Sequence, residues 1–279
     1  MPPVGFGGMP LSIAGRPPEE QGLRVLHAVL DAGVTLLDTA DAYCLEDGDV
    51  GHNERLFAKA LRQWKGPRDS VIVATKGGLV RPQGSWERNG RPEHLRRACD
   101  RSLKALGVER IDLYQFHAPD PAVPFAESIG ALAELQRAGK VRWLGLSNVS
   151  VREIDAARKQ VEVVTVQNRL NPFFREALQD GVLAHCAGLG IGFLAYSPVG
   201  GGRLNKKLPE HPVVKDVARS HGASPHAVVL AWVLAQSGNV FVIPGARTEE
   251  HALDSVTASK LTLSEEELHR LTAAEFDRR

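Results

Sequence analysis

The chain has 279 residues, of which 43% are hydrophobic, and this length suits one barrel-sized domain. The 34 lysines and arginines nearly balance the 33 aspartates and glutamates without a block of one sign, which argues against nucleic-acid or membrane-surface partners. The cysteines form no CxxC pair, the N-terminus has no targeting pattern and no apolar run reaches about 18 residues, so we expect a cytoplasmic protein without a metal.

Short β-branched runs alternate with longer amphipathic segments along the chain. We expect strands at Val4–Phe6, Val34–Asp38, Val71–Lys76, Ile111–His117, Val141–Ser147, Val163–Gln167, Ile191–Tyr196 and Val240–Pro244. Helical periodicity predicts helices at 19–32, 53–64, 93–106, 124–138 and 151–160, and a capping box begins another at Ser264. Repeated strand-helix units without a linker favour a (β/α)₈ TIM barrel, with residues 1–279 as a single domain.

Polar residues follow several of these apolar strands at the point where each ends. Asp38 ends the second strand and Tyr43 follows it by five positions, while Lys76 and His117 end the next two. In a barrel, catalytic residues gather at the carboxyl ends of the strands. We therefore expect these four side chains to meet in one site.

The four side chains suit the reduction of a carbonyl group or its reverse. A phenol has a pKa of about 10 and is normally a poor acid near neutrality. A neighbouring Lys76 ammonium would favour the phenolate and strengthen Tyr43 as a proton donor, and Asp38 would hold that ammonium. His117 could orient the substrate oxygen or relay a proton, while the hydride would come from a cofactor.

Further blocks carry a family resemblance: Gly145–Asn148, Gln167–Asn168, Ala195–Pro198 and Ile243–Arg247. Together with the four residues above, they resemble the aldo-keto reductase family, in a bacterial-type form with a short C-terminal tail. The resemblance implies a (β/α)₈ barrel that binds NADP(H) without a Rossmann motif. It also implies Tyr43 as general acid and base, with Asp38, Lys76 and His117 completing a catalytic tetrad.

The resemblance also implies a set of cofactor contacts. Those at the nicotinamide would be Ser147, Asn148, Gln167 and Tyr196, those along the pyrophosphate would be Ser197, Pro198, Val199 and Gly201, and Asp38 would be a further contact. After the last strand they would be Pro244, Gly245, Arg247, Asp254 and Ser255. The lysine that many members carry there is missing, so Arg247 is expected to hold the 2′-phosphate of NADPH, or else to pair with Glu249 or Glu250.

Substrate contacts are expected from two loops. The tail after Ala274 is too short for a long specificity loop, so the pocket should be walled by residues after Tyr43 and by the loop 77–92. We expect Trp86 in that loop, with Tyr43 and His117, to contact a small carbonyl or alcohol substrate. The indole could instead pack on its own barrel.

Two other functions stay open at this point. A non-catalytic NADP(H)-binding regulatory subunit would keep the fold and the cofactor site but lose turnover. A metal-dependent hydrolase could use Asp38 and His117, although Lys76 beside Asp38 would oppose cation binding. The sequence does not name the substrate, the direction of reaction or the oligomeric state.

Overall fold

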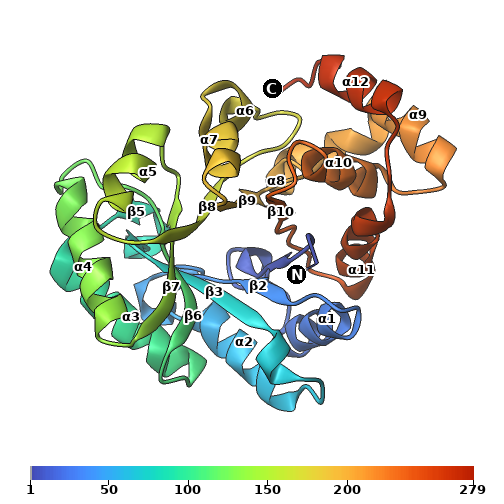
Figure 1. Cartoon of the computed structure of the whole chain (residues 1–279). Helices are drawn as coiled ribbons and strands as arrows, with labels where there is room; N and C mark the ends of the chain where they lie inside the picture. The colour runs from blue at the N-terminus through green and yellow to red at the C-terminus, as the bar shows by residue number, and fades with distance from the viewer. Residues whose placement is uncertain (1) are drawn as a thin grey trace.

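The computed structural model describes residues 2–279, in which eight parallel strands form one sheet (Figure 1). In sheet order they are β1 (Phe6–Gly7), β2 (Leu36–Asp38), β3 (Ile72–Gly77), β6 (Ile111–Phe116), β7 (Val141–Ser147), β8 (Val163–Arg169), β9 (Gly192–Tyr196) and β10 (Val240–Val242). A parallel bridge between Val4 and Val242 joins the two edges, and Gly5 N donates to Val242 O at 2.8 Å. The ring of strands is therefore closed, which confirms the predicted barrel.

Helices surround the strands. The barrel carries α1 (Glu19–Asp31), α2 (His52–Gln63), α3 (Pro92–Leu106), α4 (Phe125–Arg137), α5 (Val151–Arg158), α6 (Glu176–Gln179), α7 (Val182–Gly188), α8 (Gly201–Leu204), α9 (Pro212–His221), α10 (Pro225–Leu234), α11 (Glu249–Thr257) and α12 (Glu265–Ala273). The five helices predicted before residue 161 are confirmed within two residues at each end, and Ser264 forms the expected capping box with Glu267. None of the described helices is long and apolar enough to cross a bilayer.

No bounds were predicted from the sequence for helices α6 to α11. The clearest reason is α10, which is buried on nearly every side against the barrel and the outer helices, so its apolar residues show no 3.6 period. Its start did carry a signal, because Ser224 accepts a hydrogen bond from Ala227 N and Pro225 occupies the first turn.

The loop between β3 and α3 contains a two-stranded antiparallel hairpin outside the barrel. Its strands are β4 (Leu79–Val80) and β5 (Glu87–Arg88), joined through a 3-10 turn at Pro82–Gly84. The hairpin leaves the barrel at the carboxyl end of β3, directly after Lys76 and Gly77. It therefore lies beside the end of the barrel where the predicted site residues gather.

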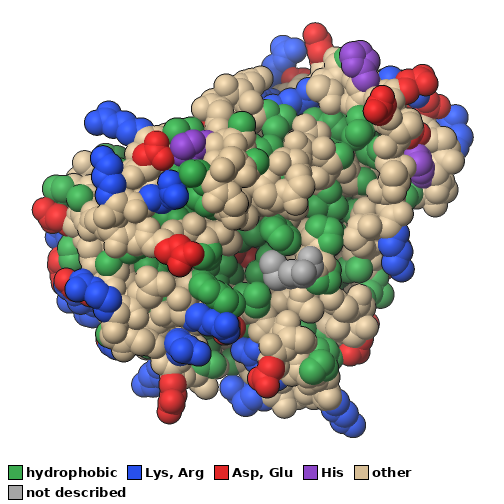
Figure 2. All heavy atoms as spheres, in the orientation of Figure 1, with side chains coloured by type: hydrophobic (Ala, Val, Ile, Leu, Met, Phe, Trp, Pro, Cys, Tyr) green, Lys and Arg blue, Asp and Glu red, His purple; other side chains and the backbone are tan. Residues whose placement is uncertain are grey.

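Charges of both signs are interspersed over the face drawn in Figure 2. Blue and red side chains alternate around its rim, and no large area of one sign appears there. This distribution agrees with the near balance of charge in the sequence.

Candidate active site

The site is built by the period-two alternation of the barrel strands. Inside the barrel, a small apolar cluster is formed by Leu36, Ala74, Leu113, Leu194 and Ile243. Two residues further along four of these segments, within β2, β3, β6 and β9, stand Asp38, Lys76, Gln115 and Tyr196. Because a strand repeats its direction every second residue, side chains two positions apart lie on the same face. A polar layer thus lies on the apolar one at the carboxyl ends of the strands.

Lys76 lies at the centre of this polar layer. Its ammonium donates to Asp38 Oδ1 at 2.6 Å, to Thr39 O at 2.9 Å and to the Tyr43 hydroxyl at 3.0 Å. Burial by itself lowers the pKa of Lys76, but Asp38 and Tyr43 more than offset this, so its pKa lies above the usual value. Lys76 is therefore charged at neutral pH, with its three N–H donors in use.

Tyr43 reaches the site from the turn after β2 and is 7% exposed. Burial raises the pKa of Tyr43 above its usual value, and the Lys76 charge offsets this only in part. Lys76 thus acts in the direction expected from the sequence, but the net shift is opposite, because sequence reasoning weighed the neighbouring charge without the desolvation. The phenol stays protonated at neutral pH and can donate its proton.

His117 faces Tyr43, with ring centroids 5.8 Å apart and planes at 78°. Burial, with a smaller effect from the Lys76 charge, lowers the pKa of His117 well below its usual value, so the imidazole is neutral. Its Nδ1 is buried and finds no hydrogen-bond partner among residues 2–279. The structure therefore brings together the four side chains of the predicted tetrad.

Gln115 and Gln167 hold the other oxygen of Asp38. Gln167 Nε2 donates to Asp38 Oδ2 at 2.8 Å and Gln115 Nε2 does so at 3.2 Å. Gln167 was expected at the cofactor carboxamide; its NH₂ group donates to the Asp38 carboxylate, and the contact with the cofactor stays a prediction. Gln115 was missed by sequence reasoning, although a polar residue two positions before His117 on a largely apolar strand is a usable signal.

Ser147, Asn148 and Tyr196 form a second group beside His117. Asn148 Nδ2 donates to His117 O at 2.9 Å, and the Tyr196 hydroxyl donates to Asn148 Oδ1 at 2.8 Å. Ser147 Oγ donates to Gln167 O at 2.8 Å. Asn148 adopts a positive φ of 57°, an uncommon backbone conformation for a non-glycine residue that concentrates at functional sites. These three predicted cofactor residues therefore lie together, next to the tetrad.

The turn after β9 contains Ser197, Pro198, Val199 and Gly201. Ser197 also has a positive φ, of 48°, and its carbonyl accepts from Gly200 N at 2.9 Å. Gly200 and Gly201 have φ values of 93° and 70°, which L side chains rarely adopt. A Cβ on Gly201 would meet only Ser197 Oγ, at 3.8 Å, so open space borders this backbone turn.

The chain end packs beside this turn. Arg278 Nε donates to Phe173 O at 2.5 Å, and Arg203 Nη2 in α8 donates to Arg278 O at 2.6 Å. Phe276 stacks on His211 with centroids 4.1 Å apart. The short tail is therefore fixed to the segments that follow β8 and β9.

The predicted residues after β10 have varied partners. Pro244 O accepts from Gly7 N at 3.0 Å, and Gly245 is exposed. Arg247 is exposed and donates from Nε to Pro10 O at 3.2 Å and from Nη2 to Ala14 O at 2.9 Å. The expected alternative, pairing with Glu249 or Glu250, is not found in the described chain, where Glu249 pairs with Arg24 at 3.0 Å.

Asp254 and Ser255 lie on α11 and bond within the fold. Asp254 Oδ2 accepts from Ser224 Oγ at 2.6 Å, and Ser255 Oγ donates to His251 O at 3.0 Å. Both polar groups already have partners from α10 and α11. Their predicted cofactor contacts stay predictions.

Trp86 lies at the rim of the site in the β4–β5 hairpin. Its indole is 46% exposed and meets the Tyr43 ring edge-on, with centroids 6.4 Å apart. The Arg81 guanidinium covers the ring at 4.0 Å from its centroid. The indole is therefore beside the phenol rather than packed under the loop.

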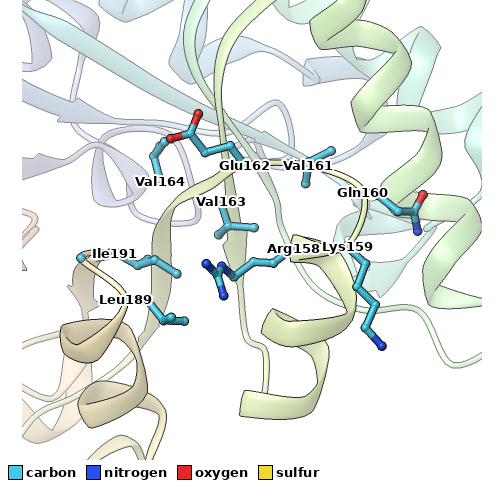
Figure 3. A pocket seen from close by; sticks show the side chains of 10 residues that line it. Arg158, Lys159, Gln160, Val161, Glu162, Val163, Val164, Leu189 and Ile191 are labelled. Carbon is cyan, nitrogen blue, oxygen red and sulfur yellow. The ribbon is translucent and has the colours of Figure 1, made fainter.

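A surface hollow lies at the opposite end of the barrel. A hollow of about 530 Å³ is lined by 158–164 and 189–191, at the starts of β8 and β9 (Figure 3). Parallel strands place their starts and ends at opposite ends of the barrel, so this hollow is remote from Lys76. Among residues 2–279, no group of three His, Cys, Asp or Glu side chains has metal-site geometry.

The family of this chain follows from its similarity to known proteins. A sequence model described as the Aldo/keto reductase family matches residues 3–275. The chain belongs to the aldo/keto reductase family. This confirms the resemblance drawn from the tetrad and the strand-end blocks.

Relatives span nearly the whole chain. Probable aldo-keto reductase 1 of Glycine max is 33% identical over an alignment of 300 residues. The alignment covers 97% of this chain and 84% of that protein. A thermostable aldo-keto reductase solved with the inhibitor epalrestat has a TM-score of 0.83 at 31% identity, covering 98% of this chain and 95% of that one. An aldo/keto reductase of Klebsiella pneumoniae solved with NADP and acetate has a TM-score of 0.81 at 27% identity, covering 97% and 90%.

Proposed function

We propose that this aldo/keto reductase family member is an NADPH-dependent oxidoreductase that reduces an aldehyde or ketone to the alcohol. One observation carries the proposal: Lys76 Nζ lies within hydrogen-bonding distance of both Asp38 and the Tyr43 hydroxyl, beside a neutral His117. A protonated phenol that is 7% exposed and lies beside a buried ammonium is suited to proton donation.

Each member of the tetrad has a distinct task in this proposal. Tyr43 donates its proton to the carbonyl oxygen and takes it back in alcohol oxidation. Lys76 stabilises the phenolate that remains, and Asp38 keeps the ammonium charged and in place. His117, neutral and 7% exposed, directs an N–H toward the substrate oxygen and so orients the carbonyl.

The residues around the tetrad fit a nicotinamide cofactor. When bound, NADPH supplies the hydride that reduces the carbonyl carbon. Ser147, Asn148 and Gln167 offer amide and hydroxyl groups for its carboxamide, and Tyr196 offers a ring face. The turn Ser197–Gly201 has the open space beside Gly201 that a pyrophosphate requires for close approach to backbone. The exposed Arg247 would hold the 2′-phosphate, and the relative from Klebsiella pneumoniae solved with NADP supports this cofactor.

The regulatory-subunit alternative requires a protein that binds the cofactor but does not catalyse the reaction. Lys76, Tyr43 and Asp38 keep the hydrogen-bonded geometry of a working proton donor, which favours catalysis. The hydrolase alternative needs a cation near Asp38. Lys76 already occupies Asp38 Oδ1 at 2.6 Å, and this charge opposes a metal there.

A carbonyl panel tests the proposal. Aldehydes and ketones are offered to the purified protein with NADPH, and the loss of NADPH absorbance is followed, while cofactor affinity is measured by fluorescence quenching. We expect the parent protein to consume NADPH with at least one carbonyl compound, and the Tyr43→Phe variant to lose this activity. Tight NADPH binding without turnover across the panel would favour the regulatory subunit. Absence of NADPH binding would exclude both the reductase and the regulatory subunit.

A further inference from the structure

Arg81 connects two loops that border the site. One is the turn after β2 that carries Tyr43, and the other is the β4–β5 hairpin that carries Trp86. Arg81 Nη1 donates to Cys44 O at 2.9 Å and Nη2 donates to Leu45 O at 3.2 Å. Nη2 also donates to Gly84 O in the hairpin turn at 2.7 Å, and Nε donates to the same oxygen at 3.2 Å.

This pattern differs from that of a surface arginine. Arg81 is 6% exposed, and its four hydrogen bonds all end on backbone carbonyls. The planar fork of a guanidinium can reach several acceptors with fixed geometry, which a lysine ammonium cannot reproduce. Arg81 therefore acts as a cross-link between the loops rather than as a member of an ion pair.

The hairpin turn needs such a cross-link. Gln83 has a φ of 50° and Gly84 a φ of 82°, so the turn contains a non-glycine residue in a sparsely populated backbone region. Such conformations persist when surrounding contacts hold them. The two bonds from Arg81 to Gly84 O supply that restraint.

The cross-link also sets the position of Trp86. The guanidinium covers the indole at 4.0 Å from the ring centroid, so the exposed 46% of Trp86 lies on the other face and the edges. Leu45, whose carbonyl Arg81 holds, is 39% exposed on the neighbouring turn. Of the three large hydrophobic residues exposed in the described chain, two thus lie on this rim beside Tyr43.

We propose that Arg81 is a positioning residue that fixes Trp86 against the Tyr43 turn, so that the rim favours carbonyl substrates bearing a flat apolar group over short aliphatic ones. The proposal rests on the proposed reductase function and adds the substrate preference of that site. An immobilised indole loses little further freedom when an aromatic group stacks on it, whereas a mobile one must first be ordered.

The test compares Arg81→Met with Arg88→Met, an exposed arginine of the same hairpin on β5. Benzaldehyde and propanal serve as substrates with saturating NADPH. Arg81→Met is expected to raise the KM for benzaldehyde about tenfold with kcat within threefold, and to leave the KM for propanal nearly unchanged. Arg88→Met should resemble the parent protein. A KM that is unchanged, or that rises equally for both aldehydes, overturns the proposal.

Trp86→Ala gives a second variant at an exposed position, where folding is not at risk. It should raise the benzaldehyde KM to a similar extent, and the double variant should add little further, since both changes remove one wall. Fully additive losses would show that Arg81 acts independently of Trp86.

Hydrogen exchange separates this proposal from the proposed function. Amides of 79–89 should exchange at least tenfold faster in Arg81→Met than in Arg88→Met, whether or not the protein turns over. Unchanged exchange there overturns the role of Arg81. Absence of NADPH consumption by the parent protein with either aldehyde counts against the proposed function and the substrate preference, while the exchange result still decides the cross-link.

Discussion

The Lys76 ammonium and the Asp38 carboxylate form an ion pair of 2.6 Å in which the two side chains are 0% and 2% exposed. A buried pair of this kind contributes modestly while intact, but removing one partner leaves an uncompensated charge in the interior. The same ammonium reaches Tyr43, so the pair links the stability of the barrel to its proposed chemistry.

Lys76→Met should lower the free energy of unfolding by about 3–5 kcal/mol, because Asp38 is left buried without its cation. Lys140→Met is a matched control, since Lys140 pairs with Asp100 at 2.5 Å while both side chains stay 39% and 55% exposed. The control should lose less than about 1 kcal/mol. Denaturant unfolding of both variants measures the difference, and similar losses would contradict it.

The same variant should also move the alkaline limb of the pH-rate profile for carbonyl reduction. The Lys76 charge lowers the pKa of Tyr43 against the larger effect of burial, so its removal raises that pKa further. Deprotonation of the phenol ends proton donation, and the limb should therefore shift to higher pH. A normal rate with an unshifted limb would exclude Lys76 from the mechanism.

Tyr43→Phe should slow the chemical step strongly while leaving cofactor binding intact. The change keeps the ring and its packing but removes the proton donor, so kcat should fall about 10²- to 10⁴-fold, roughly 3–5 kcal/mol. Cofactor affinity, measured by fluorescence quenching on the same preparation, should stay within a few-fold of the parent value. A near-parental rate would mean that the proton comes from elsewhere, with His117 the next candidate.

Asp41→Asn should change how stability depends on pH. Asp41 is 1% exposed, and burial, with the nearby Glu54 carboxyl, raises its pKa from 3.8 to about 8 even though Arg101 lies 3.7 Å away. The folded state thus binds more protons than the unfolded state between these values, so this contribution is complete below about pH 4 and is lost as the pH rises toward 8.

The variant lacks this carboxyl, so its free energy of unfolding should fall less between pH 5 and pH 8 than that of the parent protein. Asp47→Asn in the same turn, at an exposed position, is the control. Denaturant melts at several pH values give the slopes. Parallel slopes for parent protein and Asp41→Asn would show that Asp41 is charged in the fold at neutral pH.

Arg247→Ala should weaken NADPH binding at least tenfold, about 1.4 kcal/mol, and leave NADH binding nearly unchanged, because only NADPH carries the 2′-phosphate. Arg24→Ala is a suitable control, since Arg24 is exposed and already pairs with Glu249. Titrations of both variants and the parent protein with NADPH and with NADH measure the change in affinity. Equal losses for NADPH and NADH would show that Arg247 supports the fold through Pro10 and Ala14 instead.

Deletion of residues 277–279 should leave the order of carbonyl substrates unchanged but weaken cofactor binding several-fold. The deleted residues hold Phe173 and Arg203, which border the turn proposed for the pyrophosphate. Arg279→Ala, at a side chain that is 96% exposed, serves as the control. A changed substrate order with unchanged cofactor affinity would place the tail over the substrate pocket.

The barrel could be predicted from residue patterns alone, and so could the four side chains that the structure brings together at its carboxyl end. Polar residues at strand ends could be identified because buried strands are otherwise apolar. Asp38, Lys76 and His117 are each preceded by a largely apolar segment. Helix ends were readable where local chemistry decides them, as at Ser264 with its capping box and at Gly107 with a φ of 68°.

Properties that depend on burial and on distant neighbours could not be predicted from the sequence. The pKa of Tyr43 rises because packing around the phenol removes water, a quantity that residue spacing does not contain. Gln115 and Gln167 meet on Asp38 from strands that are 77 and 129 residues away in the chain. Arg81 likewise donates hydrogen bonds to carbonyls 36 and 37 residues earlier in the chain. Every residue has a backbone carbonyl, so the sequence does not indicate which ones will accept. Local patterns specify elements, whereas contacts between distant residues exist only once the strands have closed into a barrel.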